Sequence, residues 1–171
     1  GRAAGGGGTV VKMTFTINGV ARTVEAEPGE VLLDLLRREG YTGAKFGCGQ
    51  GFCGACTVLL DGEPVNSCLL LAGLAEGRGI TTIEGIGAVD ALHPIQEAFL
   101  DAGAVQCGYC TPGFILSTKA LLDRNPDPGD EEIKGALDGN YCRCTGYVKI
   151  VDAVKLAAKR TRGAGRRGVR R

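Results

Sequence analysis

The chain has 171 residues, 44% of them hydrophobic and 23% charged, which is typical of a globular protein with one domain or two small ones. It has no apolar stretch of membrane-spanning length and no signal-peptide core near its amino end, so we expect a cytoplasmic protein without a membrane span. The Gly-containing run 159–171 has seven basic residues and no acidic ones, whereas the chain before it has 13 basic and 19 acidic residues. We therefore expect a solvated or partner-docking tail rather than a nucleic-acid-binding face.

The first half of the chain has the pattern of a small sheet with one helix packed across it. Strands are predicted over residues 10–17, 20–26, 57–60, 64–67 and 80–84. The two-residue turns Asn18-Gly19 and Asp61-Gly62 join the strands into hairpins. Apolar residues at helical spacing predict a helix over 31–38, with Gly40 as its stop.

Four cysteines in this half have the spacing of an iron-sulfur cluster site. Within GCGQGFCGACTVLLDGEPVNSC they follow the pattern C-x4-C-x2-C-x11-C. A C-x4-C-x2-C run with a distant fourth cysteine is typical of plant-type [2Fe-2S] ferredoxins, and the intervening glycines allow backbone N–H groups to approach sulfur closely. The predicted ligands are Cys48, Cys53, Cys56 and Cys68.

Other uses of these cysteines stay open from the pattern alone. Four thiolates can form a structural zinc site, although zinc ribbons usually pair two C-x2-4-C knuckles across a longer loop. Disulfides suit a secreted framework better than a tight group of cysteines in a chain without a secretory segment. Gly49 to Gly54 also matches G-x-G-x-x-G, but a strand-like TVLL follows instead of the helix that a dinucleotide site requires.

The second half, after Gly87, changes to helical periodicity, and we place the boundary near residues 85–92. Helices are predicted over residues 93–102, 111–123, 130–137 and 147–159. His93 is the only histidine, and we interpret it as a helix-entry residue because two complete cysteine quartets leave no need for a histidine ligand.

Four more cysteines lie at the joints between these helices. Cys107 and Cys110 form C-x2-C in QCGYCTPG, and Cys142 and Cys144 form C-x-C in NYCRCTGY. Because alternate joints of a helix bundle lie at the same end, the pairs are expected to converge into a second four-thiolate site, with Tyr109 packed over it. Zinc stays an alternative here since C-x2-C is a common zinc knuckle, although C-x-C is uncommon in structural zinc sites.

The motifs GCGQGFCGACTVLLDG, QCGYCTPG and NYCRCTGY, in this order, resemble the iron-sulfur subunit of the molybdenum hydroxylases, the xanthine oxidase family. The resemblance implies an α+β fold with two [2Fe-2S] domains: a ferredoxin-like β-grasp domain over residues 11–86 and a four-helix-bundle domain over 87–159. A flexible leader over 1–10 and the basic tail 160–171 lie outside it.

The resemblance also implies partners and an electron path. A large subunit would hold the molybdopterin-molybdenum centre and a medium subunit FAD, in a heterotrimer or a dimer of heterotrimers. The second quartet would lie nearer to molybdenum, and Gln106 and Cys144 would contact the pterin. From the residues alone, Gln106 would instead be interpreted as a helix-end cap.

The leading hypothesis is therefore an electron-transfer subunit that passes electrons singly to FAD or another acceptor, in an enzyme for an N-heterocycle or an aldehyde. No catalytic residue is expected in the chain itself. The alternatives are the small subunit of aerobic carbon monoxide dehydrogenase, a freestanding two-cluster carrier and a zinc-stabilised interaction module.

Overall fold

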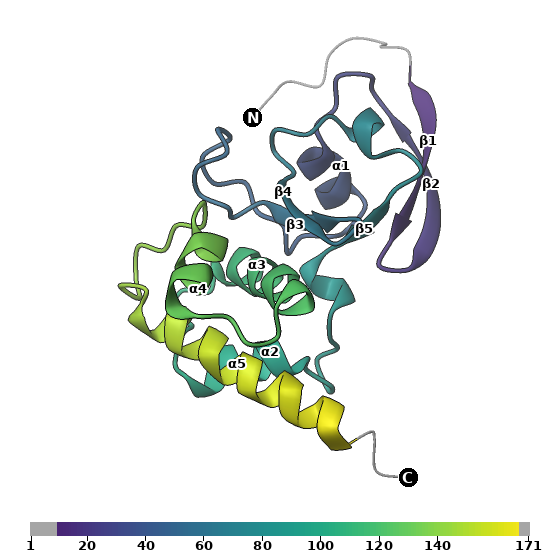
Figure 1. The fold of residues 1–171 in the computed structure, drawn as a ribbon. Helices are drawn as coiled ribbons and strands as arrows, with labels where there is room; N and C mark the ends of the chain where they lie inside the picture. Colours follow the sequence, from purple (N-terminus) through teal and green to yellow (C-terminus); the bar gives the residue numbers. More distant parts are fainter. Residues whose placement is uncertain (1–9, 168–171) are drawn as a thin grey trace.

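The computed structural model describes residues 10–167, with side chains described as far as residue 163. The first half is a mixed sheet with one α-helix, and the second half consists of four α-helices (Figure 1). The predicted α+β class is confirmed at this level. Residues 1–9 and 168–171, which hold most of the predicted leader and the end of the predicted tail, lie outside the described residues.

The sheet has the strand order β2-β1-β5-β3-β4, in which β1 and β5 are parallel and the other neighbours antiparallel. The strands are β1 Val11–Ile17, β2 Val20–Ala26, β3 Thr57–Leu60, β4 Glu63–Asn66 and β5 Gly79–Thr81. Both hairpin turns are tight, with positive φ at Asn18 and at Asp61 as the predicted turn type requires.

The core of the first half lies between the sheet and α1 (Leu32–Arg38). Along β1 every second side chain is buried, which is the alternation that a sheet with one covered face produces. The leucines of α1 are fully buried against these residues, and each contributes about 1.5–3 kcal/mol from apolar burial. This packing fixes both ends of the loop that follows α1 and leads into β3.

The helices of the second half are α2 Pro94–Asp101, α3 Thr111–Arg124, α4 Asp130–Leu137 and α5 Val148–Arg167. The central helix is α3, which is buried over most of its length and lies between the other helices and the β3–β4 hairpin (Figure 1). His93 begins α2 as predicted: its Nδ1 accepts a hydrogen bond from Ile95 N–H at 3.2 Å, and Gln96 Oε1 accepts one from His93 N–H at 2.9 Å. Within residues 10–167, every helix is too short or too polar to cross a lipid bilayer.

Two predicted element ends, those of the last strand and of the last helix, are wrong by more than one residue. The last strand ends at Thr81 rather than at residue 84, because the backbone N–H of Thr82 donates to Asn18 Oδ1 (2.8 Å) and a short 3-10 helix, η2 (Ile83–Gly85), follows. A second 3-10 turn that the pattern did not predict, η1, covers Ala72–Ala75.

The last helix, α5, was expected to end at residue 159 but continues to Arg167. Ion pairs from Arg160 to Asp101 and from Arg162 to Asp127 attach this extension to the rest of the second half. These contacts lie between residues far apart in the chain, so the local Gly-containing sequence does not reveal them.

Candidate metal centres

The first cysteine quartet surrounds the loop between α1 and β3. Cys48, Cys53 and Cys56 lie in this loop, and Cys68 follows β4. The loop backbone points at sulfur: Cys48 N–H donates to Cys53 Sγ at 3.3 Å, and Gln50 N–H donates to Cys48 Sγ at 3.4 Å. The predicted close approach of backbone N–H groups to sulfur is therefore present.

Glycine is required at Gly47 for steric reasons. A Cβ atom there would lie 2.6 Å from Cys53 Sγ, much closer than real Cβ contacts allow. Any other residue would push the sulfur away from the position that the loop gives it.

The thiols of the first quartet differ in acidity. The hydrogen bond from Gln50 N–H lowers the pKa of Cys48 to about 6, which favours the thiolate form of this side chain. Burial raises the pKa of Cys56 to about 12, and the Cys68 thiol beside it adds to the shift. A positively charged metal site next to Cys56 would replace its proton, since metal ligands must be thiolates.

The second quartet combines two segments that are distant in the chain. Cys107 and Cys110 lie between α2 and α3, and Cys142 and Cys144 lie between α4 and α5. All four line one cavity of about 180 Å³, whose wall also includes Cys53 from the first loop. The predicted convergence of the two helix joints is thus observed.

Two hydrogen bonds from Thr145 reach the sulfur of Cys142. Its hydroxyl donates to Cys142 Sγ at 3.0 Å and its N–H at 3.4 Å. Although burial opposes ionisation of Cys142, these two bonds lower the pKa of its thiol. Tyr147 supports the same residue, because its hydroxyl oxygen accepts a hydrogen bond from Cys142 N–H at 3.1 Å.

The thiols of both quartets lie in pairs. Cys48 is beside Cys53 and Cys56 beside Cys68, while Cys110 is beside Cys142 and Cys107 beside Cys144. Among residues 10–167, no three His, Cys, Asp or Glu side chains gather around one point to hold a single ion. A [2Fe-2S] cluster has two iron atoms with two protein ligands each, so the paired thiols fit this group.

The two cysteine sites adjoin each other through contacts that the sequence does not reveal. Tyr109 lines the cavity of the second quartet, as expected. In addition, its hydroxyl donates to Phe46 O in the first half at 2.6 Å, and Lys45 lies over its ring. Tyr141 N–H donates to Cys53 O at 2.9 Å. The only signal in the sequence is that Tyr109 and Tyr141 stand directly beside cysteines.

Gln106 does not act as the helix-end cap that its residue type suggested. It lies exposed between α2, which Ala102 caps, and α3, which Cys110 precedes. Cys107 and Cys144 are also exposed, so the second quartet opens to the surface near Gln106.

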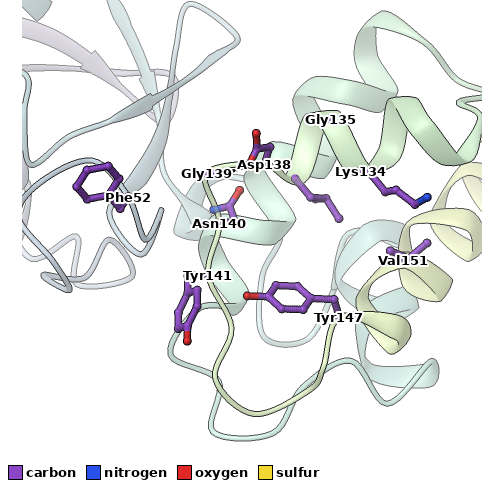
Figure 2. A pocket seen from close by; sticks show the side chains of 10 residues that line it. Phe52, Lys134, Gly135, Asp138, Gly139, Asn140, Tyr141, Tyr147 and Val151 are labelled. Atoms are coloured by element: carbon purple, nitrogen blue, oxygen red, sulfur yellow. Dashed lines mark hydrogen bonds between the residues drawn. The ribbon is translucent and has the colours of Figure 1, made fainter.

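A separate cavity of about 590 Å³ lies beside the second quartet, and Figure 2 shows its wall. Phe52 contributes from the first half, while Asn140, Tyr141 and Tyr147 contribute from the segment that joins α4 to α5. The residues Phe52 and Tyr141 are 75% and 51% exposed, so aromatic rings lie at the surface around this opening.

Comparisons with known proteins agree with this division into two cysteine sites. Residues 15–79 match the 2Fe-2S iron-sulfur cluster binding domain family, and residues 82–155 match the [2Fe-2S] binding domain family. Over 151 residues the chain is 54% identical to the nicotinate dehydrogenase small FeS subunit of Eubacterium barkeri, a match that covers 88% of this chain and 96% of that subunit.

Two further relatives extend the comparison. The nicotine 6-hydroxylase small subunit of Paenarthrobacter nicotinovorans is 50% identical over 145 residues, which cover 84% of this chain and 87% of the relative. The crystal structure of quinoline 2-oxidoreductase from Pseudomonas putida 86 aligns with a TM-score of 0.86 at 43% identity, and covers 93% of this chain and 98% of the matched chain.

The chain belongs to the iron-sulfur subunits of the molybdenum hydroxylases. As a member of this family it is the electron-transfer subunit of an oxidoreductase, and two [2Fe-2S] clusters supply its one-electron chemistry. The polypeptide contributes paired thiols, hydrogen bonds to sulfur and the contacts that hold the two sites side by side.

Proposed function

We propose that Cys48, Cys53, Cys56 and Cys68 bind one [2Fe-2S] cluster and that Cys107, Cys110, Cys142 and Cys144 bind the other. The observation that carries this proposal is that four thiols from two distant segments line one small cavity, directly beside the loop that holds the first quartet. The pairing of thiols within each quartet supports two iron atoms per site, and argues against a zinc-stabilised module.

In this proposal, residues 11–86 form a ferredoxin-like β-grasp domain and residues 87–159 a four-helix-bundle domain. The strand order with parallel β1 and β5 at its centre, and the helix α1 packed across the sheet, support the first assignment. The mutual packing of α2, α3, α4 and α5 supports the second.

The two sites face different partners in this proposal. The second quartet faces a large molybdopterin-binding subunit, with Gln106 and Cys144 in contact with the pterin, because the exposed side of that site includes both residues. The first quartet faces an FAD-binding medium subunit or a comparable acceptor. The exposed phenylalanines Phe46 and Phe52 of the first loop support a partner contact there, since large exposed apolar groups commonly mark interfaces.

We further propose that the complete enzyme is a cytoplasmic heterotrimer, or a dimer of heterotrimers, that oxidises an N-heterocycle. Relatives named for nicotinate, nicotine and quinoline support this substrate class. The aldehyde alternative rests on the aldehyde oxidoreductase of Megalodesulfovibrio gigas, which is 46% identical to the chain over 153 residues.

The test is to purify the chain from its native source under mild conditions with whatever binds it. We expect a complex with molybdopterin, FAD and about four iron atoms per copy of this chain, whose visible absorption bleaches when nicotinate or quinoline is added. If an aldehyde bleaches the absorption and the N-heterocycles do not, the substrate class is an aldehyde instead of an N-heterocycle. Elution of a coloured protein near the chain mass of 17.7 kDa would favour a freestanding carrier, and a colourless zinc protein would refute the proposal.

A further inference from the structure

One side chain, Asn140, connects its own segment, between α4 and α5, to two others at the point where the two halves meet. Its Nδ2 donates a hydrogen bond to Gly54 O in the first cysteine loop at 3.3 Å. Its Oδ1 accepts a hydrogen bond from the hydroxyl of Ser117, a buried residue of α3, at 2.8 Å. Figure 2 shows Asn140 on the segment between α4 and α5, beside the cavity that Phe52 lines from the other half.

The backbones at this junction are too close for side chains to intervene. A Cβ atom on Gly54 would lie 2.2 Å from Asn140 Nδ2 and 2.5 Å from Gly139 O, and a Cβ atom on Gly113 of α3 would lie 2.2 Å from Gly54 O. Gly54 also has φ +64°, which disfavours any residue with a Cβ. The first cysteine loop therefore rests directly on the backbone of the second half.

The junction lies within one or two residues of a cysteine on each side. Gly54 follows Cys53, and Asn140 precedes Tyr141, whose N–H donates to Cys53 O at 2.9 Å; Cys142 comes next. A shift of Asn140 relative to Gly54 would thus move Cys142 relative to Cys53.

We propose that Asn140 is a positioning residue that sets the spacing between the two cysteine sites, and hence between the two clusters. This rests on the proposed ligand sets. A primary amide has a donor and an acceptor on one planar group, so it can bond Gly54 O and the Ser117 hydroxyl at once. A carboxylate keeps the acceptor for Ser117 but has no proton to donate to Gly54 O, and its charge repels that oxygen.

The test compares Asn140→Asp with Asn125→Asp in the native complex. Asn125 is the matched control, since its Nδ2 donates to Glu132 within the second half, away from the junction. Both clusters are reduced, and electron paramagnetic resonance measures the magnetic coupling between them, which falls steeply with distance. We expect Asn140→Asp to lose the resolved splitting, with both clusters still present by iron content, and Asn125→Asp to keep the splitting of the unchanged protein.

Ser117→Ala is a milder second variant. It removes the hydroxyl that donates to Asn140 Oδ1, and it adds no charge. We expect a weaker splitting, and faster hydrogen exchange at Tyr141 N–H. An unchanged splitting in Asn140→Asp with both clusters present would overturn the proposal. If Asn140→Asp does not assemble, an unchanged splitting in Ser117→Ala would overturn it as well. Absence of iron-sulfur signals from the unchanged protein would instead refute the proposed function.

Discussion

The two cysteine sites differ in how their geometry is produced. In the first, three of the four cysteines lie in one loop, whose own backbone N–H groups point at sulfur. In the second, two distant joints must meet, and contacts from Tyr109 to Phe46 O and from Tyr141 to Cys53 O attach them to the first loop. The first site is therefore built locally, whereas the second depends on the first for its support.

The largest expected effect is on the iron content of two variants, each of which lacks one thiol from one of the two sites. Cys144→Ser should lower the iron content from about four atoms per chain to about two, because the exposed Cys144 belongs to the dependent site and the first site stays intact. Cys56→Ser should lower it to fewer than two, since Cys56 is buried in the first core and its loop supports the second site. Iron analysis of the purified complexes measures both values.

The matched variants differ only in which site they damage. Equal iron contents of about two atoms per chain in both variants would contradict the dependence of the second site on the first.

Glycine substitutions at the junction and away from it sharpen the same comparison. Gly54→Ala should destabilise the protein by more than about 3 kcal/mol, because a Cβ at positive φ would also collide with Asn140 and Gly139 O. Gly62→Ala has a comparable φ of +88° with no atom within 4 Å, so it should cost about 1–2 kcal/mol. Thermal unfolding of the loaded complexes measures the difference, and similar values for both variants would show that the junction tolerates displacement.

The sequence predicts the local site better than the dependent one. The C-x4-C-x2-C loop, both hairpin turns and the bounds of β2, β3 and α4 follow from spacing and turn chemistry within a few residues. The roles of Asn140 and Tyr109 do not, because their partners Gly54 and Phe46 lie far away in the chain. The end of α5 was wrong for the same reason, since ion pairs with Asp101 and Asp127 accompany its extension.

A third difference is that a side-chain hydroxyl bonds to sulfur only in the second site, among the described residues. Thr145→Val removes the O–H···Sγ bond to Cys142 with little change in shape, and Thr145→Ser keeps it. Because a hydrogen bond stabilises the more negative reduced cluster, Thr145→Val should lower one reduction potential by an amount on the order of tens of millivolts. A redox titration followed by electron paramagnetic resonance measures both clusters. A shift in both potentials, or an equal shift in Thr145→Ser, would show that the hydroxyl bond to Cys142 does not set the potential of the second cluster.

The smallest expected effect concerns His93, which lies outside both cysteine sites. Burial, with Lys119 nearby, lowers the pKa of His93 below its ordinary value of 6.5, and the neutral ring accepts the N–H of Ile95. Above pH 6.5 the ring is neutral in the folded and unfolded chain, so the cap is fully present. As the pH falls below 6.5, His93 gains a proton first in the unfolded chain. The protein therefore loses stability until the pH has passed the lower pKa of the folded state.

His93→Asn keeps a capping oxygen without this titration. The melting temperature should fall between about pH 8 and about pH 6, and it should fall less in the variant than in the unchanged protein. The two proteins should differ only modestly, because the ring is partly exposed. An identical pH dependence in both proteins would show that the His93 cap does not titrate with folding.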